Sequence, residues 1–412
     1  MLGGAVVMAL LSPPALLRRG ARLLDIGIVL TLAAIAVQLV PLAPDLRQAA
    51  SPFAAFIERQ SVMGAAAAAA QVRPISIVPD ATAIALAIDA ALAAIFWSTQ
   101  RALRRGGVRW LARTVATIGL VTAAVGIVHH LNLVPGLDGL WPVMRRELRP
   151  WGPFVNRNDF AGWLLLASGL TLGYIVARLE AHHHDDEALD VDRAFDATGT
   201  RLALALCVMS AAVMVSLSRS GLLGAAVGLA MFFAMGRGRL APVRRKPLAV
   251  ALVAIVAIGV VFANVGALSM RLQIAMSEGM VGRLSEWRQT WPMVVDFWRA
   301  GVGVGAYARV MTLYQTSTRL ITIAHADNEP LQLAAEGGVL VGVPALLMLV
   351  GFVATAARRM RADRSRLFWI RAGALSGLAA IAAQNFVEMT LRVPATGLLA
   401  VVLAAVAVHD RG

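Results

Sequence analysis

The chain alternates long apolar stretches with short polar segments that are rich in arginine. Ten stretches approach or exceed the length of about 18–20 residues that an α-helix needs to cross a bilayer. They are residues 26–44, 81–98, 110–131, 160–179, 201–217, 221–235, 248–266, 331–357, 370–387 and 394–408, and residues 3–17 could add another. The pattern predicts an all-α polytopic membrane protein with about 10–11 transmembrane helices.

The composition agrees with that prediction. Hydrophobic residues make up 58% of the 412 residues and charged residues 15%, well below the roughly 25% of soluble domains. We therefore treat residues 1–412 as a single integral-membrane domain. The one cysteine, Cys207, lies inside an apolar stretch and can form no disulfide within the chain.

The net charge of +14 comes almost entirely from arginine, since Lys246 is the only lysine. A basic balance can indicate nucleic-acid binding, but cytoplasmic loops of membrane proteins also collect arginine. Four arginine clusters fall in alternate loops between the predicted helices: residues 18–22, 101–109, 237–246 and 358–366. The positive-inside rule assigns all four to the cytoplasm, and no nucleic-acid partner is expected.

The remaining loops then lie on the extracytoplasmic face. They include residues 132–159, the turn at 216–224 and the long loop 267–330, which we expect to carry part of the active site. Nearly all segments with unusual polar residues fall on this face. The exception, HHHDDE (182–187), lies on the predicted cytoplasmic face and is interpreted as a solvated loop, although it could bind a metal.

Arg219 lies in a short turn between two apolar stretches, beside Ser218 and Ser220. An arginine close to hydrocarbon is costly unless it faces a partner or a water-filled cavity. Its forked donors suit phosphate oxygens, and the serine hydroxyls add further donors. This turn is a candidate anion site. The alternative is an arginine that extends from a helix end toward the lipid headgroups.

Arg283 belongs to a segment in which apolar residues recur near helical spacing, at Leu284, Trp287, Trp291 and Val294. The spacing predicts an amphipathic helix that lies on the membrane or covers a cavity. An ion pair with Glu286, three residues further along, is the alternative role for this arginine.

The glycine-rich segment GVGVGAY (301–307) superficially resembles a dinucleotide-binding loop. It does not follow a strand of a βαβ unit, and it lies outside the cytoplasm, so we reject that interpretation. We expect instead a tight turn that brings backbone N–H groups close to an anion.

The segment HADNEP (325–330) directly precedes the apolar stretch 331–357. Asp327 and Asn328 suit the cap position of a helix, and Pro330 suits its first turn. His325 is not needed for that purpose. At the membrane edge it could accept a proton, and the alternative is a structural histidine.

Four segments together resemble the O-antigen ligase and polymerase family of membrane glycosyltransferases: residues 153–164, 216–224, 282–308 and 325–342. The resemblance implies a GT-C-like fold with a large periplasmic loop. It also implies transfer of a glycan from an undecaprenyl-diphosphate carrier, without a metal and without a cofactor. The protein would then be a multi-pass protein of the bacterial inner membrane, with its active site facing the periplasm.

The resemblance assigns catalytic roles to Arg219, Arg283 and His325. The arginines would stabilise the diphosphate leaving group. His325 would deprotonate the acceptor hydroxyl, and a single in-line displacement would invert the sugar carbon. The other substrate-binding candidates are polar residues of the same face: Asn156, Arg157, Ser218, Ser220, Arg288 and Asn328. The chain departs from the family pattern at Ala326, where Asn or Ser is commoner.

The expected partners are the lipid bilayer, the carrier-linked donor and, for a ligase, a lipid A–core acceptor. A polymerase would instead extend carrier-linked repeat units, and the motifs do not separate these two activities. A non-enzymatic transporter of lipid-linked sugars is a third alternative, which predicts charged residues along the membrane path. The predicted helices carry few of them beyond Asp89 and Arg113, which favours catalysis at one face.

Overall fold

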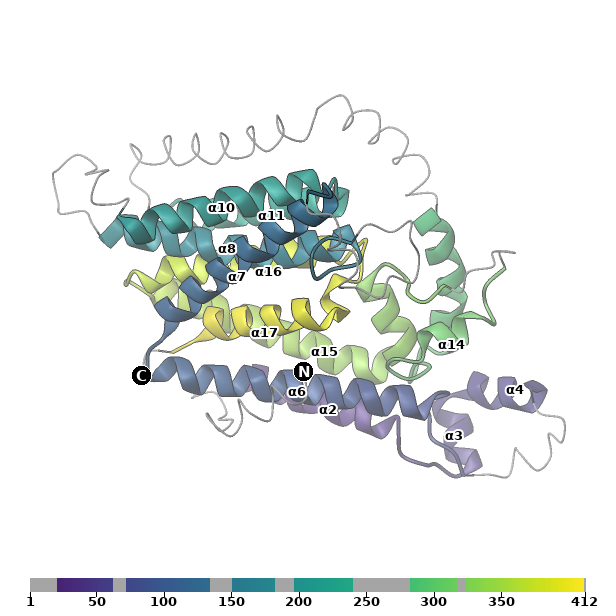
Figure 1. Ribbon diagram of the computed structural model, residues 1–412. Coiled ribbons are helices and arrows are strands. Elements are labelled where there is room, and N and C mark those ends of the chain that lie inside the picture. The colour runs from purple at the N-terminus through teal and green to yellow at the C-terminus, as the bar shows by residue number, and fades with distance from the viewer. Residues whose placement is uncertain are drawn as a thin grey trace. The chain divides into compact units, whose positions relative to one another are not determined.

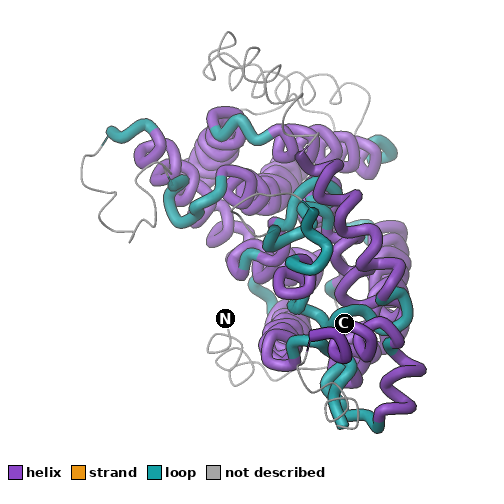
Figure 2. Tube along the Cα trace, turned by 90° about the vertical axis from the view of Figure 1, so that its right-hand side faces the viewer, coloured by secondary structure: helices purple, strands orange, loops and turns teal. Residues whose placement is uncertain are grey.

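The computed structural model describes residues 21–61, 72–133, 150–181, 196–239, 282–316 and 323–410. These residues form helices joined by loops (Figures 1 and 2). Within the described ranges there is no strand, and two isolated bridges join Leu42 to Arg73 and Trp151 to Phe154. Seven of the described helices are long and apolar enough to cross a membrane. The prediction of an all-α polytopic membrane protein is confirmed.

The observed helices include one that overlaps each predicted span within the described residues, together with short helices that were not predicted. They are α2 (Arg22–Val37), α3 (Pro44–Ala50), α4 (Pro52–Ser61), α6 (Pro79–Arg104), α7 (Val108–His130), α8 (Arg157–Ala181), α10 (Ala197–Val215), α11 (Arg219–Gly236), α14 (Tyr307–Met311), α15 (Glu329–Ala362), α16 (Leu367–Gln384), the 3₁₀ helix η2 (Thr390–Arg392) and α17 (Pro394–Val408). Residues 282–296 are also helical. The predicted spans 3–17 and 248–266 lie outside the described residues.

The chain divides into two compact units. Unit 1 comprises Met1–Ser98, Ala275–Ala357 and Phe386–Met389, and unit 2 comprises Thr99–Ile274, Arg358–Asn385 and Thr390–Gly412. Each unit is described by itself below. The expectation of a single domain over residues 1–412 remains a prediction.

The core of unit 2 is formed by α8 and α16. Their apolar stretches are 83% and 72% buried, whereas those of α7, α10 and α11 are each 33% buried. The two helices approach closely because glycines face each other. A Cβ atom on Gly169 would lie 2.7 Å from the carbonyl oxygen of Gly373, and one on Gly173 would lie 2.3 Å from that of Trp369. Small residues are the usual means by which membrane helices reach such contact.

Two arginine clusters meet at one end of unit 2. Arg239 donates hydrogen bonds to the carbonyl oxygens of Asp363 and, at 3.2 Å, of Ser365. Arg239 belongs to the cluster 237–246, and the two acceptors belong to the cluster 358–366. Because Arg239 follows the C-terminal end of α11, the N-terminal end of that 18-residue helix lies at the opposite end of unit 2.

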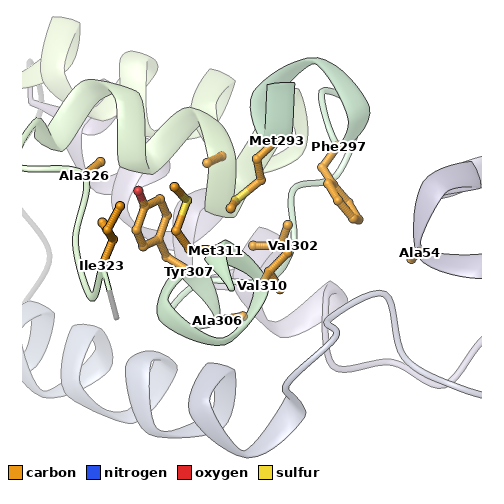
Figure 3. Packing of buried hydrophobic residues seen from close by; sticks show 11 residues of the cluster. Ala54, Met293, Phe297, Val302, Ala306, Tyr307, Val310, Met311, Ile323 and Ala326 are labelled. Carbon is orange, nitrogen blue, oxygen red and sulfur yellow. The ribbon is translucent and has the colours of Figure 1, made fainter. Parts of the chain in front are cut away.

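Helix 282–296 is amphipathic, as predicted, but its buried face differs from the predicted one. Met293, within it, and Phe297, which follows it, are buried, whereas Leu284 and Trp291 are 40% and 60% exposed. The buried residues pack against α14 and the neighbouring loops in one hydrophobic cluster (Figure 3). This cluster also contains Ala326, and it therefore links helix 282–296 to the segment that precedes α15.

Candidate functional site

The start of α15 is built by local capping. The side-chain oxygen of Asn328 accepts a hydrogen bond from the backbone N–H of Leu331 at 2.9 Å. Pro330 occupies the first turn, where its missing N–H has no intrahelical acceptor. The capping predictions for Asn328 and Pro330 are confirmed. Asp327 instead adopts a left-handed backbone conformation with φ of 47°, which turns the chain just before the helix.

The residue next to His325 is held on both of its peptide groups. The backbone N–H of Ala326 donates to Oε1 of Gln332 at 2.9 Å, and its carbonyl oxygen accepts from Nε1 of Trp287 at 2.9 Å. Ala326 is completely buried, while His325 is exposed. The small side chain at position 326 therefore occupies a packed position, and the histidine side chain beside it remains accessible.

Arg283 forms an ion pair with Glu388, whereas the alternative that the sequence suggested was Glu286. The side chain of Arg283 is 18% exposed and that of Glu388 is 6% exposed. The pairing joins helix 282–296 to the short turn between α16 and η2. Glu388 was not among the predicted site residues. The signal that could have found it is a carboxylate in a short turn on the same predicted face as Arg283.

Asp327 lies within electrostatic reach of both Arg283 and His325. Burial raises the pKa of the Asp327 carboxyl above its ordinary value of 3.8, and the charges of Arg283 and His325 oppose that rise. The described part of unit 1 thus gathers two of the predicted catalytic residues around a half-buried carboxylate. The sequence had assigned Asp327 to helix capping alone.

The replacement Asp327→Asn is expected to raise thermal stability at neutral pH, with the gain disappearing toward acidic pH. Because the folded-state pKa is raised, the carboxyl favours folding below pH 3.8, and this contribution is lost as pH rises through the raised pKa. The neutral amide does not titrate. Melting curves of both proteins in nanodiscs, from about pH 8 to about pH 4, measure the difference. A gain that grows on acidification would contradict the assignment.

The glycine-rich segment 301–305 forms the expected tight turn, but the expectation that it binds an anion is wrong. Gly301, Gly303 and Gly305 all have positive φ angles. The backbone N–H groups of the segment are used inside the protein. That of Gly303 donates to the carbonyl oxygen of Glu336 at 3.0 Å, and that of Val304 donates to Oε1 of Gln38 at 3.0 Å. The turn is hydrogen-bonded to α15 and to Gln38, so these N–H groups are not available to a ligand.

The braced part of α15 is interrupted. Gly338 has φ of 54° and ψ of −154°, which are not helical angles. Past the interruption, the N–H of Val339 donates to the carbonyl oxygen of Trp298 at 2.8 Å, and that of Leu340 to Arg299 at 2.9 Å. Loop carbonyl groups thus replace the missing intrahelical acceptors. The first turns of α15, which follow the His325 segment, are fixed by this loop.

In unit 2, Arg219 is the first residue of α11. The hydroxyl oxygen of Ser218 caps this helix by accepting from the N–H of Gly221 at 3.1 Å. Ser218 also donates to Oδ1 of Asn158 at 2.8 Å and lies 3.2 Å from the hydroxyl of Ser220. Both serines are buried. They fix the end of the helix at which Arg219, itself half-buried, is located.

Arg157 occupies the equivalent position at the start of α8. The side chain of Asn156 accepts from the N–H of Asn158 at 2.9 Å, and both Asn156 and Arg157 are exposed. The starts of α8 and α11 lie close together, since a Cβ atom on Gly221 would lie 2.8 Å from that of Ala161. Two helix N-termini, each beginning with arginine, favour an anion at this end of unit 2, and Asp159 in the first turn of α8 opposes them.

The site candidates thus fall into two groups. Arg283, Arg288, His325 and Asn328 belong to unit 1, and Asn156, Arg157, Ser218, Arg219 and Ser220 belong to unit 2. Arg288 is exposed, and the described hydrogen bonds do not join it to the other three residues of its group. Within the described ranges, no cluster of His, Cys, Asp and Glu could hold a metal ion. The segment HHHDDE (182–187) lies outside those ranges.

In a comparison with known families, residues 204–346 match the model of the O-antigen ligase family, which bears out the resemblance seen in the sequence. The matched range contains Arg219, Arg283 and His325. It supports a membrane glycosyltransferase of the ligase or polymerase type in general terms. A search of curated proteins finds no match.

Proposed function

We propose that the protein transfers a glycan from an undecaprenyl-diphosphate carrier to an acceptor on the periplasmic face of the bacterial inner membrane. The acceptor proposed first is lipid A–core, as in an O-antigen ligase. The observation that carries the proposal is the gathering of Arg283, His325 and Asp327 inside the matched family domain.

The charge on the leaving diphosphate is the main problem that such a site must solve. As the bond between the sugar carbon and the phosphate oxygen breaks, negative charge develops on the diphosphate, and fixed cations aimed at it lower the barrier. The guanidinium of Arg283 carries five N–H donors, and Glu388 holds it in place through one of its terminal nitrogens. Its remaining donors suit phosphate oxygens. Arg219 is proposed as the second cation, which makes the reaction metal-independent.

His325 is proposed as the general base. It is exposed beside a buried, hydrogen-bonded residue, so a glycan acceptor can reach its imidazole. In the proposed step, His325 takes the proton of the acceptor hydroxyl, and the acceptor oxygen forms a bond to the sugar carbon. The carrier diphosphate leaves from the opposite side, so the configuration at that carbon inverts.

Unit 2 has features that suit the two parts of the carrier, its diphosphate and its isoprenoid chain. The paired N-termini of α8 and α11 favour the diphosphate group. A cavity between α8, α10, α11 and α16 is lined mainly by apolar residues, among them Leu172, Leu206 and Leu229. Apolar walls of this kind suit an isoprenoid chain, which is the lipid part of the proposed carrier.

The activity test uses the purified chain in nanodiscs, a carrier-linked glycan donor and either lipid A–core or a second carrier-linked repeat unit. Product on lipid A–core is expected for a ligase, and longer carrier-linked chains are expected for a polymerase. The replacement His325→Ala should reduce product formation by about 10²–10⁴-fold at equal protein abundance. Full activity of this variant would remove the base assignment. Absence of product with either acceptor would favour a transporter.

A further inference from the structure

A buried glutamine connects the His325 segment to the interior of unit 1. Gln332 lies one turn into α15 and is 1% exposed. Its side-chain oxygen accepts from the N–H of Ala326 at 2.9 Å, and its side-chain nitrogen donates to Oε1 of Glu336 at 3.2 Å. Both polar atoms of the amide are therefore hydrogen-bonded, the oxygen to the segment that carries His325 and the nitrogen to a buried carboxylate.

Glu336 is a fixed anchor for this amide. It is completely buried, and its Oε1 also accepts from the N–H of Tyr307 at 3.3 Å. Its carbonyl oxygen accepts from the side chain of Gln38 at 2.9 Å and from the N–H of Gly303 at 3.0 Å. Gln38 and the segment 303–307, both distant from α15 in the sequence, thus meet at this one residue. Glu336 cannot move without breaking several buried hydrogen bonds.

The opposite side of Ala326 is tied to the helix that carries Arg283. Trp287, whose Nε1 donates to the carbonyl oxygen of Ala326, lies four residues after Arg283 and therefore on the same face of helix 282–296. The peptide groups of Ala326 consequently set the position of the neighbouring His325 relative to Arg283. The glutamine fixes one side of this arrangement and the tryptophan fixes the other.

We infer that Gln332 is a positioning residue, which holds His325 in place through the Ala326 peptide by bridging it to Glu336. The chemical consequence rests on the proposed function, in which His325 is the base. A displacement of about 1 Å at a reacting group can cost about 10²-fold in rate. The replacement Gln332→Met keeps the length of the side chain and removes both hydrogen bonds. It should lower kcat by about 10–10²-fold and leave KM within about threefold.

The exchange of the two side chains tests the bridge directly. Gln332→Glu alone retains an acceptor for Ala326 but places two carboxylates side by side in a buried site, so activity should fall. The double variant Gln332→Glu/Glu336→Gln restores a donor–acceptor pair between the two side chains, but an amide nitrogen then takes the place of the oxygen that accepted from the N–H of Tyr307. It should therefore raise kcat clearly above that of Gln332→Glu without reaching the wild-type value. A double variant no better than Gln332→Glu would overturn the inference.

Gln289→Met is the matched control. The side chain of Gln289 bonds to Ser285 and to the N–H of Thr316, and not to the segment that carries His325. Kinetic constants of this variant should stay close to those of the wild type. Equal losses of kcat in Gln289→Met and Gln332→Met would show a general structural effect and overturn the inference.

Hydrogen exchange separates this inference from the proposed function, because it needs no activity. Peptides covering residues 323–328 should exchange faster in Gln332→Met than in the wild type or in Gln289→Met. If exchange is faster but His325→Ala remains fully active, the bridge stands and the base assignment fails. If exchange at these residues is unchanged in Gln332→Met, the bridge itself is refuted.

Discussion

The replacement Arg283→Ala is expected to reduce glycan transfer by about 10²–10³-fold, the usual cost of removing one charge-stabilising donor from a reacting group. It should also destabilise the protein, because the side chain of Glu388 is 6% exposed and would lose its ion pair with Arg283. Breaking a buried pair by removing one partner costs about 3–5 kcal/mol. Transfer rates per folded protein and melting temperatures in nanodiscs measure the two effects separately.

The double variant Arg283→Ala/Glu388→Ala separates the chemical role of the arginine from its structural role. Removing both partners leaves no carboxylate that has lost this ion pair, so the melting temperature should return toward that of the wild type. Activity should stay low if the guanidinium acts on the diphosphate. Recovery of activity together with stability would mean that Arg283 only secures the turn containing Glu388. Arg283→Lys adds a third comparison, since it retains charge but loses the forked donors.

The second large effect is expected from Gly338→Ala, at the interruption of α15. The backbone angles of Gly338 are essentially restricted to glycine, and a side chain there costs about 1–3 kcal/mol in strain. An added Cβ atom would also lie 2.6 Å from the carbonyl oxygen of Trp298 and 2.7 Å from the nitrogen of Gly301. Overpacking against backbone adds about 1–3 kcal/mol. Thermal denaturation in nanodiscs should show a marked loss of stability.

Gly342→Ala is the control in the same helix. No neighbouring atom lies within 4 Å of a Cβ atom built at this position. Because alanine favours a helix over glycine by about 1 kcal/mol, this variant should be as stable as the wild type or slightly more so. If both variants lose stability alike, α15 would be sensitive to any substitution and the special role of Gly338 would be refuted.

The helices were predictable because hydropathy and length act locally. A stretch such as 110–131 is long and apolar enough to be identified without knowledge of its neighbours, and it appears as α7. Capping is equally local, which is why Asn328 was identified correctly. Residues 204–346 also carried enough of the family pattern for the resemblance to be recognised.

The connections between segments were not predictable, because their partners are far apart in the sequence. Glu388 lies 105 residues from Arg283, while Glu286 was the nearer and wrong candidate. The glycines at 301–305 were expected to bind a ligand, yet the N–H group of Gly303 donates to Glu336 of α15, which begins more than 20 residues later, and that of Gly301 donates to Phe297. A side chain or an N–H group can find many partners, and only the folded arrangement decides between them.

The hydrogen bonds of Gln38 have a consequence for the order in which the chain can fold during synthesis. Gln38 follows α2, near the beginning of the chain, and its acceptor Ala300 lies 262 residues later. At roughly 5–20 residues per second, a ribosome needs on the order of 13–50 s to make that interval. During this time the side-chain amide of Gln38 lacks the hydrogen-bond partners that it has in the folded protein. Unit 1 is therefore completed only after Glu336 has emerged, and a chain arrested before that point leaves Gln38 without its hydrogen bonds to Ala300 and Glu336.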